Sequence, residues 1–148
     1  KAALSQDDRD SSLDACTRSL NEEAMDTSDR AGTYVNRGIL RMIRGKGAAA
    51  DADFDAALSL QHDLPDAWLN KGFLRLREGN GRAALPLLQE GINRKPEHVA
   101  LAIFARGVAY EQMGEFNSAY NDLRRAHELE PRWSMPSEYL AHYQVVSR

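Results

Sequence analysis

The 148-residue chain has a single cysteine, Cys16, and this scarcity excludes two kinds of architecture. One thiol cannot build an intramolecular disulfide framework, and it cannot supply a paired-cysteine metal site. Cys16 also lacks the glycine-rich elbow or neighbouring base that marks a nucleophile. It is interpreted as a small hydrophobic residue on a helix face.

Long apolar runs and an excess of positive charge are also missing. No apolar stretch approaches the roughly 18 to 20 residues that cross a bilayer, so membrane insertion is not expected. The formal net charge is -3, whereas a protein that holds a phosphate backbone against salt usually presents a positive field. Nucleic acid is therefore not expected as a partner. With 43% hydrophobic and 28% charged residues, the chain has the composition of a folded domain.

Patterns of common catalytic and metal sites are not found either. The histidines are dispersed and form no pair at i and i+4: His62, His98, His127 and His142. Three alternating acids lack the glycine and terminal glutamate of a calcium loop: Asp51, Asp53 and Asp55. Residues 45–47 (GKG) lack the spacing and the hydroxyl residue of a phosphate-binding loop, and they are read as a turn. We expect no catalysis, no metal and no cofactor.

The sequence does contain an internal repeat with a period of about 34 residues. Residues 34–38 (YVNRG) return as 68–72 (WLNKG), with an aromatic, an aliphatic, Asn, a base and Gly in the same order. A third copy at 103–107 (IFARG) is displaced by 35 residues, which places one inserted residue near His98. Such a period predicts stacked copies of one supersecondary unit.

A small, bulky, small pattern recurs 12, 16 and 19 residues after the glycine of each copy. Its members are Ala50, Phe54 and Ala57, then Ala84, Leu88 and Gly91, then Ala119, Leu123 and Ala126. These positions share one helical face, and small residues there allow close helix packing. Glycines near 45, 79 and 114 predict turns within each unit, and prolines at 65, 96 and 131 predict breaks between units. Each unit is therefore predicted to be a helix pair.

This pattern resembles the tetratricopeptide repeat family, and the third unit resembles it most through Gly107, Tyr110, Ala119, Ala126 and Pro131. The first two units depart from it, since Arg41 and Arg75 stand in the place of Tyr110. The resemblance implies an all-α, right-handed superhelix (α-solenoid) with repeats at 31–64, 65–99 and 100–133.

The flanks are predicted to cap the solenoid. In the acidic segment 1–30, a helix over about 10–23 carries Leu13, Cys16 and Leu20 at helical spacing. In the segment 134–148, a helix over 137–146 carries a similar apolar stripe that ends at Val146. Solenoids need such terminal caps for solubility.

The resemblance also implies a concave groove lined by the first helix of each unit. The residues that it assigns to a peptide-binding groove are Val35, Asn36, Ile39, Met42, Leu69, Asn70, Phe73, Leu76, Phe104 and Val108. The apolar members would take apolar ligand side chains, and the two asparagines would bond the ligand backbone. Two alternatives stay open. The chain's own termini or a tightly coiled array cover these residues, or the asparagines bond neighbouring helices.

Three bases at helical spacing, Arg37, Arg41 and Arg44, form a basic face on the other side of the first unit's first helix. We expect them to form ion pairs between helices rather than a phosphate site. The expected acidic neighbours are Asp14, Glu22, Glu23, Asp51 and Asp55. A clamp for acidic chaperone tails is not expected, because the third unit has Ala105 where the first two have asparagine.

The sequence thus predicts a non-catalytic adaptor that binds a protein or peptide. Two rivals remain, namely a self-associating structural protein and a fragment of a larger multidomain chain. Residues 36–38 (NRG) and 14–18 (DACTR) look similar to bacterial members of the family, which favours a bacterial origin. Because the chain begins with Lys1, removal of a signal peptide is an option, and both the periplasm and the cytoplasm stay open.

Overall fold

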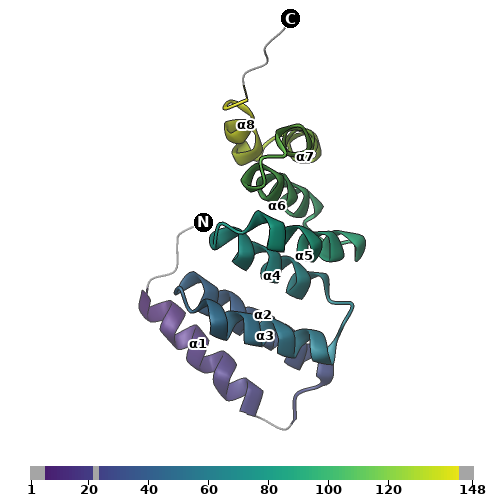
Figure 1. Cartoon of the computed structure of the whole chain (residues 1–148). Coiled ribbons are helices and arrows are strands. Elements are labelled where there is room, and N and C mark those ends of the chain that lie inside the picture. Colours follow the sequence, from purple (N-terminus) through teal and green to yellow (C-terminus); the bar gives the residue numbers. More distant parts are fainter. Residues whose placement is uncertain (1–5, 22–23, 144–148) are drawn as a thin grey trace, which may run out of the picture.

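The computed structural model describes residues 6–21 and 24–143, and this part of the chain folds into eight α-helices without a strand (Figure 1). The helices are α1 (Gln6–Asn21), α2 (Thr27–Ile43), α3 (Gly47–Leu60), α4 (Pro65–Arg77), α5 (Gly81–Asn93), α6 (Val99–Gln112), α7 (Phe116–Leu129) and α8 (Ser134–Leu140). No helix among these residues is long and apolar enough to cross a membrane.

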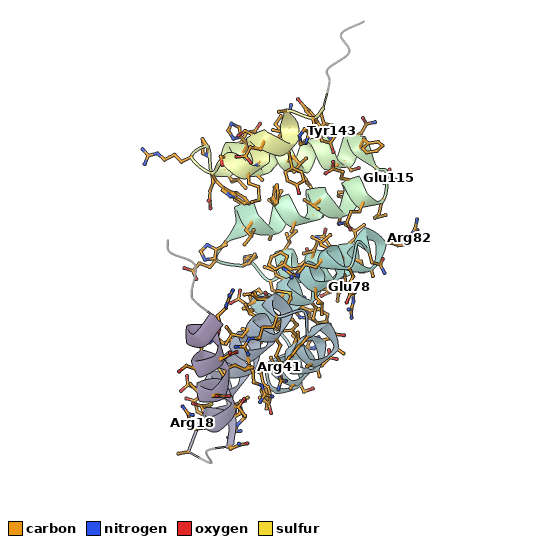
Figure 2. All side chains as sticks on the ribbon, turned by 90° about the vertical axis from the view of Figure 1, so that its left-hand side faces the viewer. Arg18, Arg41, Glu78, Arg82, Glu115 and Tyr143 are labelled. Carbon is orange, nitrogen blue, oxygen red and sulfur yellow. The ribbon has the colours of Figure 1, made fainter. Side chains whose placement is uncertain are left out.

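The helices are arranged as three stacked pairs with a further helix at each end. α2 packs on α3, α4 on α5, and α6 on α7, while α1 lies against α2 and α8 against α7 (Figure 1). The first helices of the pairs also touch, since α2 contacts α4 and α4 contacts α6. Figure 2 shows the length of the stack, with Arg18 near one end and Tyr143 near the other. The expectation of an all-α solenoid of helix pairs is confirmed.

Each pair turns at a glycine in the left-handed region, where a side chain would be strained. The φ angles are 73° at Gly45, 71° at Gly79 and 77° at Gly114. In every case the next residue's N–H reaches back to the carbonyl five positions earlier, with N···O distances of 2.9 Å for Lys46, Asn80 and Glu115. These bonds satisfy helix-end carbonyls and set the return of the second helix.

The repeated glycine of each first helix is a contact point between paired helices. A Cβ atom built on Gly38 would lie 2.5 Å from the Phe54 ring, and one on Gly72 would lie 2.6 Å from Leu88. The side chains of Phe54, Leu88 and Leu123 are fully buried. Absence of a side chain on one helix therefore makes room for a bulky one on the other, as the repeat predicts.

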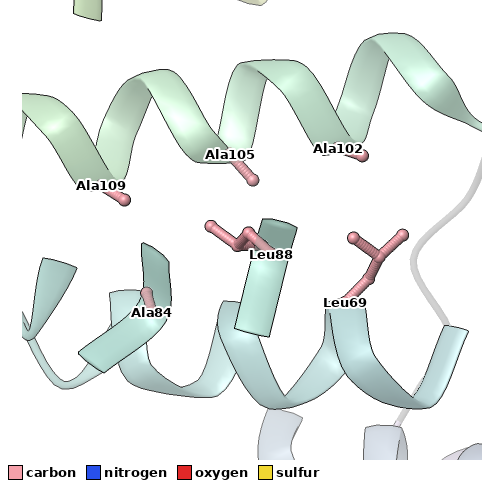
Figure 3. Packing of buried hydrophobic residues seen from close by; sticks show 6 residues of the cluster. All are labelled: Leu69, Ala84, Leu88, Ala102, Ala105 and Ala109. Atoms are coloured by element: carbon pink, nitrogen blue, oxygen red, sulfur yellow. The ribbon is translucent and has the colours of Figure 1, made fainter. Parts of the chain in front are cut away.

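Between the second and third pairs the packing depends on an alanine stripe of α6. Ala102, Ala105 and Ala109 face Leu69, Ala84 and Leu88 (Figure 3), and all six are buried. Small side chains let α6 approach the second pair closely. A Cβ on Gly81 would lie only 2.4 Å from the carbonyl oxygen of Ala109.

The inserted residue lies in the connection between α5 and α6. This connection runs over 94–98, one residue longer than the connection at 61–64 between α3 and α4. It contains Lys95, which has a φ of 54° and is the single non-glycine residue with positive φ among those described. The longer connection agrees with the 35-residue displacement of the third copy.

The terminal helices differ in extent from the expected caps. α1 begins at Gln6 and ends at Asn21, and it packs through the buried Leu20, whose carbonyl accepts a bond of 2.7 Å from Arg30 Nη1. α8 is shorter than expected, because its helix ends at Leu140, and Val146 lies outside the described residues. Trp133 and Tyr139 pack edge-on against Phe104, at ring-centroid distances of 5.0 and 5.1 Å.

Candidate functional site

A groove of about 260 Å³ lies on the face formed by the first helices of the pairs. Three parts of the chain build it: α2, α4, and the connection into α6 with that helix's first turn. Its lining consists of Val35, Asn36, Ile39, Asp66, Leu69, Asn70, Phe73, Pro96, His98 and Leu101. We call this site the α2–α4 groove.

The floor of the α2–α4 groove is apolar and belongs to the core. Val35 and Leu69 are each only 5% exposed, while Ile39 and Phe73 are half-buried. Phe73 packs against buried clusters on both sides of α4, which include Leu74 and Leu88. The floor is thus held rigidly, which favours a preformed site over one that folds around a ligand.

The rim of the α2–α4 groove is polar. Asn36 and Asp66 are exposed, and Asn70 is half-buried. Asn70 Nδ2 donates to the carbonyl oxygen of Asp66, one turn earlier, at 2.8 Å. The Asn70 side chain therefore bonds the backbone of its own helix and not a neighbouring one, and its Oδ1 keeps its acceptor capacity.

Six of the ten residues assigned from the sequence line this groove together: Val35, Asn36, Ile39, Leu69, Asn70 and Phe73. The other four lie elsewhere. Met42 is buried and lines a separate cavity with Leu74 and Arg77. Leu76 packs against the cluster between the second and third pairs.

In the third pair, Phe104 and Val108 pack with the end of the chain. Phe104 is 7% exposed and, like Val108, it belongs to a cluster with Trp133, Tyr139 and Leu140. Here the alternative reading, in which a terminal helix lies over the first-helix residues, describes the structure. α8 packs on α7, and its Tyr139 side chain contacts Phe104.

Sequence reasoning missed four lining residues, Asp66, Pro96, His98 and Leu101. For two of them a signal was available, because Asp66 precedes Leu69 by three positions and Leu101 precedes Phe104 by three, and residues three apart share a helix face. Leu101 is 40% exposed. Pro96 and His98 lie in the connection that carries the inserted residue, whose path the repeat does not determine.

A second cavity, of about 550 Å³, adjoins the α2–α4 groove. It is lined by His98, Leu101, Glu130, Arg132 and Trp133. His98 and Leu101 line both cavities, so the two cavities adjoin at these side chains. A ligand lying in the α2–α4 groove can extend to the Trp133 side chain.

All three bases on the basic face of α2 form ion pairs, as expected, but their partners differ from those named from the sequence. Arg37 and Arg41 both bind the buried carboxylate of Asp53, each at 2.8 Å, and Arg44 pairs with Asp10. The hydrogen bonds that Arg37 donates to Asp53 raise the pKa of Arg37. Asp14, Asp51 and Asp55 were the wrong partners, and Glu22 and Glu23 lie outside the described residues.

Arg37 and Asp53 stand 16 positions apart, and the third pair repeats this bridge. Arg106 Nε lies 2.7 Å from Asp122 Oδ2, and that hydrogen bond raises the pKa of Arg106. In the second pair the equivalent position is Leu87, which cannot accept a bond. Lys71 and Arg75 instead bind Asp51 of the preceding pair, at 3.2 and 2.6 Å.

Three aspartates of α3 thus act as ion-pair partners, with Asp55 also bound by Lys71. Burial opposes ionisation of Asp51, but hydrogen bonds from Arg75 and Lys71 outweigh it, and the pKa of this carboxyl is lowered. Among the described residues, no group of three or more His, Cys, Asp or Glu side chains is arranged to hold a metal ion.

Cys16 lies on α1, half-buried, and burial raises the pKa of its thiol despite the opposing charge of Arg37. A raised pKa lowers the thiolate fraction and with it the nucleophilicity. This environment is that of a structural cysteine.

The fold and the groove define a class, the helical-repeat solenoid whose first helices line a binding face. Within it, residues 100–133, the third helix pair, match the tetratricopeptide repeat model. The matched segment comprises α6, α7 and the connection to Trp133. No curated protein matches the chain.

Solved structures of similar fold include proteins from Desulfovibrio magneticus RS-1 and from Arabidopsis. MamA from Desulfovibrio magneticus RS-1 (residues 41 to end) is 22% identical, with a TM-score of 0.76 over 90% of this chain and 72% of that one. The tetratricopeptide domain of Arabidopsis OM64 is 16% identical, with a TM-score of 0.72 over 78% and 95%. The first such domain of Spaghetti (RPAP3), solved with an HSP90 peptide, is 19% identical, with a TM-score of 0.72 over 81% and 94%. At these identities the likeness establishes the fold alone.

Proposed function

We propose that this chain is a non-catalytic interaction module that binds a peptide segment of a partner protein in the α2–α4 groove. The observation that carries the proposal is the juxtaposition of an apolar floor with a polar rim. Val35, Ile39, Leu69 and Phe73 offer a rigid surface for apolar side chains. Asn36, Asp66 and Asn70 offer groups that bond a peptide backbone.

The shape of the two adjoining cavities fits an extended segment better than a compact molecule. They run from α2 across α4 to Leu101 and on to Trp133. The RPAP3 domain of similar fold binds the peptide SRMEEVD. We extend to this chain only the mode, a linear segment held by a helical solenoid. Under this proposal the pairs at 31–64, 65–99 and 100–133 act as three repeats, with 1–30 and 134–148 as the ends.

A steric block tests the proposal. Peptides that bind the wild-type chain are first selected from a random phage-displayed library, and their affinities are then measured by calorimetry. Asn36→Trp fills the rim, and because Asn36 is exposed the variant keeps the core intact. Its control is Asn121→Trp, at an exposed position on α7 outside both cavities. We expect Asn36→Trp to weaken binding at least tenfold and Asn121→Trp to leave it unchanged.

A rival function, self-association, is separated from peptide binding by sedimentation. A self-associating structural protein would show a sedimentation coefficient that rises with concentration in the range of tens of micromolar. A peptide-binding module would sediment as one species and change only when peptide is added. If Asn36→Trp has no effect on any selected peptide, the α2–α4 groove is not the binding site.

A further inference from the structure

Basic and acidic side chains are distributed unevenly around the α2–α4 groove, and this distribution bears on which peptides the groove would bind. Arg37, Arg41 and Lys71 lie on the helices that line the groove, but each bonds an aspartate of α3. Arg106 of α6 is bound by Asp122 and by Gln89 of α5. These bases are directed to the second-helix side, and none of them lines the groove.

Acceptors remain on the groove side. Asp66 lines the groove, is exposed, and has no salt bridge to any described residue. One N–H of the Asn70 amide is donated to the carbonyl oxygen of Asp66, and the Asn70 carbonyl oxygen keeps its acceptor capacity beside the remaining N–H. Asp66 and Asn70 are four positions apart on α4 and share one face. The α4 rim therefore presents a carboxylate and an amide oxygen beside an apolar floor.

We propose that the groove selects a segment in which a cationic side chain, lysine or arginine, stands next to apolar residues. The proposal rests on the peptide-binding function argued above and specifies its ligand. An ammonium or guanidinium group placed at Asp66 and Asn70 would donate to both oxygens, and charge-assisted bonds are the stronger ones. Its apolar neighbours would occupy the floor formed by Ile39, Leu69 and Phe73. An acidic segment would meet an uncompensated carboxylate.

The adjoining cavity does not reverse this preference. Its charged groups are Glu130 and Arg132, of opposite sign, and both are exposed. Its apolar wall consists of Leu101 and Trp133, and the ring face of Trp133 also attracts a cation. The α4 rim therefore determines the charge preference. Removing the charge of Asp66 should leave the other contacts to the peptide in place.

The experiment uses three end-capped twelve-residue peptides with the same leucine positions and with lysine, glutamine or glutamate at the remaining polar positions. Affinities for the whole chain are measured by fluorescence anisotropy at low and at physiological salt. The variant is Asp66→Asn, which keeps size and an acceptor oxygen while removing the charge. The matched control is Asp63→Asn, the same change at an exposed acid three positions earlier that lines none of the described cavities.

We expect the wild-type chain to bind the lysine peptide at least tenfold more tightly than the glutamate peptide at low salt, with the difference reduced as salt rises. Asp66→Asn should reduce that preference by about fivefold, the upper range for one exposed ion pair. Asp63→Asn should leave it within twofold. Because Asp66 also lies in the first turn of α4, the melting temperature of each variant is measured in parallel.

Equal or tighter binding of the glutamate peptide would overturn the proposal, as would a lysine preference unchanged in folded Asp66→Asn or no binding of any of the three peptides. Binding of the neutral glutamine peptide distinguishes failure of the cationic preference from failure of the groove as a binding site. If Asn36→Trp abolishes glutamine-peptide binding while the charge preference is absent, the groove stands and the cationic preference is wrong.

Discussion

Lys71 Nζ lies 3.2 Å from Asp51 Oδ1, and this contact joins the second helix pair to the first. In the other two pairs the equivalent base turns inward to an aspartate of its own pair. Lys71 has Leu87 at that position and reaches back to α3 instead, where Arg75 joins it on the same carboxylate. One substitution in the repeat thus converts a bridge within a pair into a bridge between pairs.

This bridge predicts a stability that depends on pH. Asp51→Asn removes the charge that Lys71 and Arg75 share, and at pH 7 we expect a loss of about 1 kcal/mol in the free energy of unfolding, because the three side chains are only partly screened by solvent. The folded-state pKa of Asp51 lies below its ordinary value of 3.8. Its contribution is therefore present above pH 3.8 and disappears as pH falls through the lowered pKa.

Urea unfolding of wild type and Asp51→Asn at several pH values checks this. The difference between the two should shrink below pH 4, and Asp63→Asn, at an exposed acid without a salt bridge among the described residues, should differ little from wild type throughout. A difference that is constant from pH 7 to pH 3 would contradict the account of Asp51.

Replacing the repeated glycine by alanine should change stability differently at Gly72 and at Gly107. Gly72→Ala places a Cβ 2.6 Å from Leu88 Cδ2 and 2.7 Å from its Cγ, so buried atoms must move. Gly107→Ala meets nothing closer than 3.2 Å. Both variants gain up to about 1 kcal/mol of helix propensity, while overpacking costs about 1 to 3 kcal/mol. We expect Gly72→Ala to be the less stable by at least 1 kcal/mol.

Thermal and urea unfolding of the two glycine variants provide the comparison, and each serves as the other's control because the repeat position and the change are the same. Equal stability, or a more stable Gly72→Ala, would show that α4 and α5 are farther apart than described here.

The thiol of Cys16 should react slowly. Burial raises its pKa, so at pH 8 the thiolate fraction is smaller than in an unstructured peptide, and access is also restricted. Reaction with a disulfide reagent should be several-fold slower in the native chain than in the same chain in denaturant. A native rate equal to or above that of a free peptide thiol would point to an activated cysteine and would reopen a catalytic reading of this chain.

Much of the fold can be read from the sequence because the repeat encodes pair packing locally. A glycine on one helix opposite a bulky residue on the next, as in Gly38 and Phe54, predicts a close helix crossing in each copy, and Gly45 predicts the turn. The ion pairs were less predictable, because Asp51 and Asp55 share a helix with Asp53 and only the stacking of the second pair decides which bases each one meets. Cross-pair partners depend on the angle between units, which no single repeat contains.

The site was predictable in part for the same reason. Six residues of α2 and α4 follow from the resemblance, which places the groove on the first helices, together with helical spacing. Phe104 and Val108 obey the same spacing but are packed with Trp133 and α8, a contact between segments that the repeat does not describe. His98 belongs to the connection lengthened by one residue, whose course is set by Lys95 in its left-handed conformation.

The most direct test of peptide binding in the α2–α4 groove is a map of backbone amide shifts in a ¹⁵N-labelled chain titrated with the lysine peptide or with a selected peptide. We predict that the largest shifts cluster at Val35, Asn36, Leu69, Asn70 and Leu101, with small shifts along α3, α5 and α7. Shifts concentrated on those second helices, or on α1 and α8, would contradict the proposed site.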